Sequence, residues 1–125
     1  MQLSLEDKPY IMIYEHIKPE DFKWEDAEPG IKIARVSDFE VRLSIVKGRK
    51  GATTTSHSHS HGSFIYITKG KIKIETFILT PGTAGACRPG PGHYHAEFLE
   101  DSEYIVCRST KDIITKYEDM GLSTG

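Results

Sequence analysis

The chain has 125 residues, of which 27% are charged and 38% hydrophobic, a balance typical of one soluble globular domain. Its formal net charge of −2 argues against nucleic acid as the main partner, because phosphate binding needs a basic surface. The sequence has no membrane-length apolar run and no signal-peptide pattern, and its two cysteines, Cys87 and Cys107, are too few for a disulfide framework. We therefore expect a cytoplasmic protein without membrane contact, with two buried free thiols.

The first third of the chain predicts an N-terminal arm followed by short strands. Residues 1–10 are mixed in character and predict the arm, and residues 10–14 have strand composition. A short helical turn is expected within 18–24, and a polar turn within 26–30. Alternation of apolar and polar residues then predicts two strands with one buried face, at 31–36 and 41–46.

The rest of the chain continues as short strands separated by Gly and Pro turns. The expected strands are 64–68, 71–75, 77–79, 84–88, 96–99 and 103–108. Many short strands with regular turns predict an all-β sandwich or barrel. The only good helix candidate is the C-terminal segment 111–120, followed by Gly121 as a cap.

Three histidines alternate with serines just before the strand at 64–68. In a β-strand, residues two apart share one face, so His57 and His59 can turn their imidazoles toward one point. Neutral imidazoles suit Fe, Zn, Ni, Cu and Mn sites. The pattern therefore predicts half of a metal site, the alternative being a polar surface loop. The third histidine, His61, is either a reserve ligand or a residue at the cavity mouth.

The spacing of these residues resembles the two motifs of the cupin family. Gly51, His57, His59, Ser63 and Gly70 follow the first motif, G-x5-H-x-H-x3-E-x6-G, with serine in place of its glutamate. The second motif, G-x5-P-x-G-x2-H-x3-N, is matched without gaps at Gly82, Arg88, Gly90, His93 and Glu97. Its proline is displaced by one place, to Pro89, and its asparagine is absent. The resemblance is to a small single-domain cupin of the RmlC-like jelly-roll type.

The resemblance implies an all-β fold, a double-stranded β-helix or cupin jelly roll, over residues 1–125 as a single domain. It implies His57, His59 and His93 as metal ligands. His95 is the alternative to His93, because Gly92-x2-His95 repeats the local spacing. Tyr94 and Glu97 lie beside these ligands and are candidate acid–base or orienting residues of the pocket, or else surface residues.

Ser63 is the main departure from the family pattern. Without the glutamate, three neutral histidines leave a divalent ion fully cationic and one coordination position open to water or substrate, as in catalytic sites. Cupin-like dioxygenases with a three-histidine iron site share this ligand set, so Fe(II) is the first choice of cofactor, with Zn, Ni or Mn as alternatives. The other interpretation of Ser63 is a cupin with weak or no metal binding.

The parity of the strand at 64–68 predicts its two faces. Ser63, Ile65 and Ile67 should face the cavity, and Phe64 and Tyr66 should face outward. Exposed aromatic side chains need a cover, and a homodimer interface is the natural one.

We expect a metal-dependent cupin that acts on a small organic substrate, in its most specific form a three-histidine Fe(II) dioxygenase-like enzyme. The alternatives are a non-catalytic metal- or ligand-binding cupin module with a sensory or regulatory role, and a cupin isomerase or lyase. Fold alone cannot choose between them.

Overall fold

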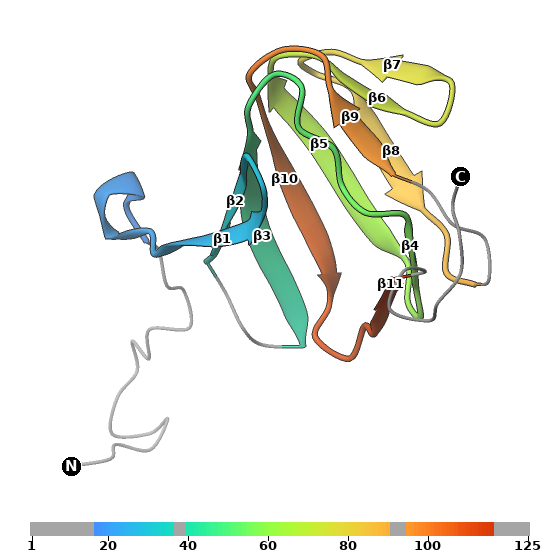
Figure 1. The fold of residues 1–125 in the computed structure, drawn as a ribbon. Helices are drawn as coiled ribbons and strands as arrows, with labels where there is room; N and C mark the ends of the chain where they lie inside the picture. Colours follow the sequence, from blue (N-terminus) through green and yellow to red (C-terminus); the bar gives the residue numbers. More distant parts are fainter. Residues whose placement is uncertain (1–16, 37–39, 91–94, 117–125) are drawn as a thin grey trace.

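The computed structural model describes residues 17–36, 40–90 and 95–116. In this part of the chain, Figure 1 shows a short 3-10 helix, η1 (Pro19–Asp21), and strands that fold around one interior. The first strands are β1 (Trp24–Glu28), β2 (Ile31–Arg35), β3 (Val41–Gly48), β4 (His57–His59), β5 (Ser63–Lys69) and β6 (Ile72–Ile74). The remaining strands are β7 (Phe77–Leu79), β8 (Ala84–Cys87), β9 (Ala96–Phe98), β10 (Ser102–Ser109) and β11 (Ile114–Lys116).

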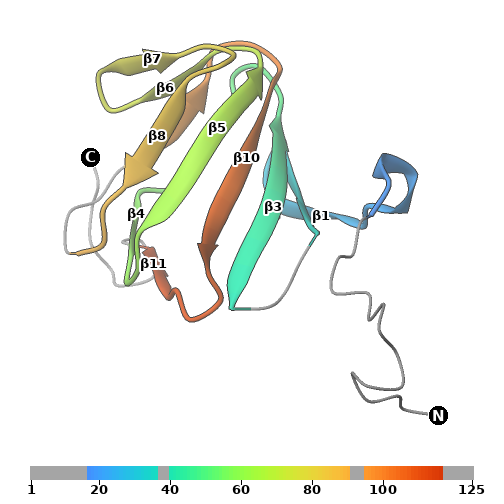
Figure 2. The same cartoon turned by 180° about the vertical axis from the view of Figure 1, so that it is seen from behind.

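The strands form three antiparallel sheets. The largest has the order β1-β2-β3-β10-β5-β8, a second has the order β7-β6-β9, and β11 pairs with β4. Figure 1 shows β6, β7 and β9 at one end of the large sheet and the β4–β11 pair at the other, and Figure 2 shows β6, β7 and the β4–β11 pair from behind. In the large sheet β10 lies between β3 and β5, so strands distant in sequence are neighbours. The all-β jelly roll predicted from the motifs is confirmed.

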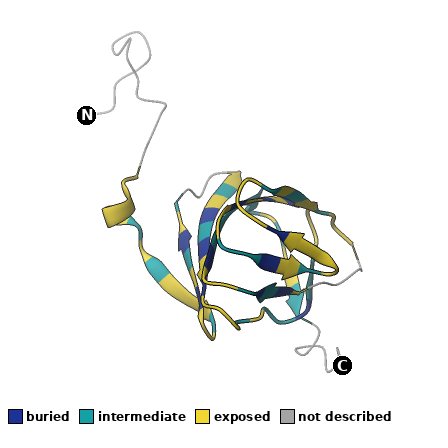
Figure 3. Cartoon of the chain, turned by 90° about the horizontal axis from the view of Figure 1, so that it is seen from above, coloured by how far each residue is buried: buried dark blue, intermediate teal, exposed yellow. Residues whose placement is uncertain are grey.

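The core lies between the sheets and is built mainly from alternate residues of the strands. Figure 3 shows the buried segments on strands that surround a common interior. In β5, Ile65 and Ile67 are 9% and 0% exposed, whereas Phe64 and Tyr66 are 65% and 47% exposed, as the alternation predicted. Phe98, also fully buried, packs in the same cluster. Burying one such side chain stabilises the fold by about 1.5–3 kcal/mol.

The motif glycines occupy turns that other residues adopt only with strain. Gly51, Gly70 and Gly82 have φ values of 89°, 88° and 90°, in the left-handed region. Gly70 is constrained twice, because a Cβ there would also collide with the Ser102 side chain. These turns set the spacing between β3, β5 and β8, which explains why the glycines of the pattern fall where they do.

Two local predictions were wrong. Residues 24–28 form β1 rather than a polar turn from 26, because this edge strand pairs with β2 and needs to bury little. The C-terminal helix predicted over 111–120 is not formed where the structure describes that segment: Ile114–Lys116 is β11, paired with β4. A run of β-branched residues favours the strand, and tertiary pairing outweighs a weak helix propensity.

Some predictions fall on residues that the structure does not describe. The arm at 1–10, the strand at 10–14 and the helix positions beyond 116 lie outside the described ranges. Within the described ranges, no helix is long and apolar enough to cross a membrane.

Candidate metal centre

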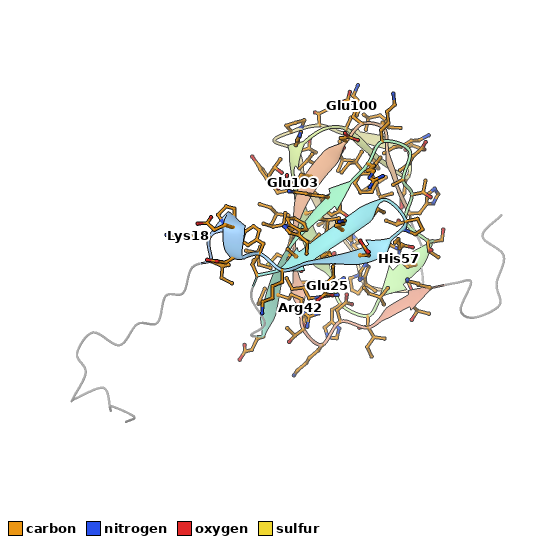
Figure 4. The ribbon with its side chains drawn as sticks, turned by 60° about the vertical axis from the view of Figure 1, so that its left-hand side comes forward. Lys18, Glu25, Arg42, His57, Glu100 and Glu103 are labelled. Atoms are coloured by element: carbon orange, nitrogen blue, oxygen red, sulfur yellow. The ribbon has the colours of Figure 1, made fainter. Side chains whose placement is uncertain are left out.

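A cavity of about 370 Å³ opens on the inner face of the large sheet. Its walls are mostly aliphatic, with Ile31, Val46, Ile65, Ile74, Ala96 and Val106 among them. Both histidines of β4, His57 and His59, line the same cavity, and Figure 4 labels His57 together with Glu25, another of its lining residues. A volume of this size matches a small organic molecule.

The two histidine rings of β4 lie next to each other, and the Nδ1 atom of each is close to an oxygen atom. Their centroids are 5.0 Å apart, with an angle of 77° between the ring planes. The Nδ1 of His57 is 2.6 Å from the carbonyl oxygen of Thr55. The Nδ1 of His59 is 2.6 Å from Oδ2 of Asp112. The predicted sharing of one face by His57 and His59 is therefore present in the structure.

These contacts set the tautomers of both rings. A carbonyl oxygen and an ionised carboxylate only accept hydrogen bonds, so Nδ1 of each neutral ring carries the proton and donates it. The lone pair then lies on Nε2, the nitrogen that a metal would take. Metal-ligating histidines typically donate their other N–H to a carbonyl or a carboxylate. The donor set of His57 and His59 thus fits a divalent ion.

Burial also keeps one of these rings in the metal-binding protonation state. It lowers the pKa of His57, the hydrogen bond with the Thr55 carbonyl raises it in part, and the neighbouring His59 lowers it again. The net direction is downward, so the neutral imidazole is favoured at neutral pH.

Asp112 is a buried carboxylate beside His59 that the sequence did not reveal. Its side chain is 1% exposed, and it accepts hydrogen bonds from His59 and from the backbone N–H of His61, the latter at 3.0 Å. Burial alone would raise the pKa of Asp112, but these hydrogen bonds and the nearby charge of Arg108 lower it overall. A carboxylate is therefore maintained beside His59. Asp112 comes 53 residues later in the chain, and only the pairing of β11 with β4 brings it there.

A second carboxylate, that of Glu28, contacts the residue that orients His57, and the sequence did not reveal it either. The Oε1 atom of Glu28 accepts hydrogen bonds from the backbone N–H and the hydroxyl of Thr55, at 2.9 and 2.6 Å. Thr55 in turn offers its carbonyl to His57. Glu28 from β1 therefore fixes the segment that orients the first histidine.

Of the other predicted site residues that the structure describes, one lines the cavity and three do not. Ser63 is 3% exposed and lines the cavity. His61 and His95 are exposed and do not line it. Glu97 lies between Ala96 and Phe98, which are buried, so strand alternation turns its side chain away from the cavity.

The second half of the predicted centre falls on the undescribed segment 91–94. His93 and Tyr94 lie in that segment. Among the described residues alone, no group of three His, Cys, Asp or Glu side chains is arranged to hold a metal ion. The third ligand therefore stays a prediction.

Comparisons with known proteins agree with this architecture. The structure of KdgF from Halomonas sp. shares 28% identity, with a TM-score of 0.67 over 78% of this chain and 94% of that one. An acetylacetone dioxygenase from Acinetobacter johnsonii shares 16% identity, with a TM-score of 0.72 over 93% and 85% of the two chains. The Rhodobacter sphaeroides complex of SigE with the anti-sigma ChrR also matches, at 14% identity and a TM-score of 0.64 over 74% and 51%.

The last two similarities concern the fold alone. No curated protein matches this chain by sequence. The model of the ChrR cupin-like domain matches residues 14–111. This range includes both histidines of β4 and the whole large sheet, and it ends just before Asp112. The chain therefore belongs to the ChrR cupin-like family.

Proposed function

We propose that this protein is a metal-dependent enzyme that acts on a small organic substrate in the cavity. The observation that carries the proposal is the pair His57 and His59, whose Nδ1 atoms are both engaged at 2.6 Å, an arrangement typical of histidines that bind a metal through Nε2. We propose His93 as the third ligand, with His95 as its alternative and His61 in reserve. Fe(II) is the first choice of metal, followed by Zn, Ni or Mn.

The protein's own residues would shape and hold this site. A bound divalent ion supplies Lewis acidity, and Fe(II) also supplies a redox-active centre. Glu28, through Thr55, and Asp112 keep the two imidazoles oriented. Ser63 is a poor ligand where the family pattern has a carboxylate, and it would leave room for substrate. The aliphatic walls would exclude water from the bound molecule.

The most specific form of the proposal is an oxygenation that opens a ring or cleaves a C–C bond. It rests on the neutral three-histidine donor set, which cupin-like dioxygenases share. Isomerase or lyase chemistry would use the same residues. Oxygen consumption in the presence of the substrate separates these reactions, because only the oxygenation takes up O2.

Metal analysis of the purified protein tests the proposal. We expect about one equivalent of metal per chain by elemental analysis, as one site of this kind holds one ion. His57→Ala, His59→Ala and His93→Ala should each lower the metal content strongly, and His61→Ala, which removes an exposed histidine, should not. If the metal content is unchanged in both His57→Ala and His93→Ala, the assignment fails.

A non-catalytic sensory or regulatory module is the second candidate. It is favoured by the match to the ChrR cupin-like domain, because one structural neighbour is the complex of SigE with the anti-sigma ChrR. The cavity beside the histidines supports the enzyme instead, since a purely structural metal site needs no space for a substrate. Turnover of any small molecule by the metal-loaded protein would decide for the enzyme.

We also propose that the protein is a homodimer through the outer face of the large sheet, the face that Figure 2 turns toward the viewer. Phe64 and Tyr66 are exposed on this face, and Ile105 lies opposite Tyr66 in the next strand. A second copy would cover these side chains.

A further inference from the structure

One end of the cavity wall carries a cluster of polar side chains, Ser44, Ser63 and Arg108, which we call the polar corner. All three residues line the cavity. Arg108 in β10 lies directly opposite Ser63 in β5. Ser44 in β3 lies opposite Val106, two residues before Arg108, so Ser44 and Arg108 are diagonal neighbours on the same face.

Ser44 is an unpartnered hydrogen-bonding group in this corner. The residue is 1% exposed, and its Oγ has no hydrogen-bond partner among the described residues. Buried hydroxyls are almost always paired, because leaving one unpaired costs free energy. An unpaired hydroxyl on a cavity wall therefore indicates a ligand that binds in the cavity and forms a hydrogen bond with it.

Arg108 is the second polar group of this corner, and the described residues use little of its hydrogen-bonding capacity. Its side chain is 14% exposed, and its closest ionic contact is Asp112, at the long distance of 3.9 Å. Asp112 already accepts a much shorter hydrogen bond from His59. Within the described ranges the guanidinium makes no hydrogen bond, although it carries several N–H donors in a planar fork. That fork matches the two oxygens of a carboxylate.

The other charged groups of the cavity limit the charge of the ligand. Glu25, Asp26 and Glu28 line it from β1, Arg35 from β2 and Lys116 from β11. Arg35 is paired with Glu25 at 2.9 Å, and Glu28 is held by Thr55. The acidic side chains of β1 would repel a dianion such as phosphate more strongly than a monoanion, so a singly charged acid is favoured over phosphate.

We propose that the polar corner binds the carboxylate of a small organic acid, with Arg108 donating to both carboxylate oxygens and Ser44 donating from its hydroxyl. The rest of the ligand is apolar, because Val46, Ile65 and Val106 form the adjoining wall. This inference deepens the proposed function by naming the substrate class, and it rests on that function for the ligand to be a substrate. Binding of the acid itself needs only this chain.

The first experiment measures binding to the metal-free protein, prepared with a chelator, by isothermal titration calorimetry. The probes are benzoate and phenylacetate, their amides benzamide and phenylacetamide, and inorganic phosphate. The acids should bind roughly tenfold or more tightly than the amides of the same shape, because the hydrogen bonds from Arg108 are charge-assisted. Equal binding of acids and amides, or tighter binding of phosphate, overturns the inference.

Variants of the arginine locate the site. Arg108→Gln should lose roughly tenfold or more of the affinity for benzoate, and Arg108→Lys should lie between it and the wild type, because lysine keeps the charge without the fork. Arg35→Gln is the matched control in the same cavity. It should stay within about threefold of the wild type, because this guanidinium is already engaged by Glu25. Equal effects of Arg35→Gln and Arg108→Gln overturn the assignment.

Ser44→Ala separates binding from folding. Removing an unpaired buried hydroxyl should leave the Tm unchanged or raise it, while benzoate binding weakens several-fold. A lower Tm with unchanged binding contradicts the role given to Ser44. Metal content is measured on separate metal-loaded samples. If the wild-type protein takes up metal but does not bind the acids, only this inference is overturned, whereas if it binds the acids but takes up no metal, only the proposed function is overturned.

Discussion

At the scale of single residues, the candidate centre contains histidines that the sequence pattern predicts and a carboxylate that it does not predict. His57 and His59 are recognisable because they alternate in a strand. Asp112, which orients one of them, is not recognisable, because nothing local distinguishes it from any other acidic residue. Long-range contacts of this kind arise only when strands pair.

Asp112→Asn should weaken metal binding by roughly tenfold or more, the usual loss when a group that orients a metal ligand is changed. The amide lacks the negative charge that holds the Nδ1 proton of His59. Competition with a chromophoric chelator measures the affinity. Asp101→Asn is the matched control, because Asp101 also accepts a hydrogen bond, but from the backbone N–H of Lys50 at 2.9 Å, whereas Asp112 accepts one from the ring of His59. Equal affinities in the two variants would contradict the role of Asp112.

The lowered pKa of His57 predicts a pH-dependent stability of the metal-free protein. Its pKa is lower folded than unfolded, so the unfolded chain binds more protons once the pH falls below about 6.5. The free energy of unfolding should therefore decrease below that pH, by at most about 1.4 kcal/mol per pH unit from this group. Denaturant titrations at several pH values should show a smaller slope in His57→Asn, and the wild-type slope in the exposed-site control His95→Asn. If the free energy of unfolding of His57→Asn depends on pH as steeply as that of the wild type, His57 is not the origin of this dependence.

At the scale of elements, β11 shows where local sequence is misleading. The segment 111–120 has the composition of a short helix, but Ile114, Thr115 and Lys116 pair with His59, Ser58 and His57. This pairing aligns the strand that carries both histidines and brings Asp112 beside them. A three-residue strand has little intrinsic preference of its own, so its partner decides its conformation.

Thr115→Pro should lower metal affinity by disturbing β4, because proline cannot donate to a strand ladder. The control is Ile78→Pro in β7, which is likewise the middle residue of a three-residue edge strand, in the other small sheet. Both variants should lose some stability in thermal melts. Only Thr115→Pro should lose metal in elemental analysis, and metal loss of equal size in both would mean that general destabilisation is the cause.

At the scale of the whole molecule, the large sheet has one face toward the cavity and one exposed face with aromatic side chains. The inner face carries the cavity wall. The outer face exposes Phe64 and Tyr66, which a lone chain leaves in water. The strand alternation that builds the site therefore also builds a surface suited to self-association.

The proposed homodimer predicts a mass in solution of twice the 14.1 kDa of one chain. Phe64→Asp should shift the protein toward monomer, because it places a charge in the proposed interface. Light scattering after size-exclusion chromatography measures the mass. Phe77→Asp is the matched control, as Phe77 is equally exposed at 67% but belongs to β7 of the smaller sheet. A monomeric wild type, or equal dissociation by both changes, would argue against this interface.

The sequence by itself determined the fold and the position of the two candidate ligands of β4. Turn glycines such as Gly70, strand alternation and the His57–His59 spacing are local features, and each follows from the geometry of a few neighbouring residues. The tertiary structure decided what surrounds them. Asp112 behind His59, Glu28 behind Thr55, and the polar corner of Ser44 and Arg108 come from segments brought together only by strand pairing. Such pairings are set by the burial of the whole core, which no short pattern encodes.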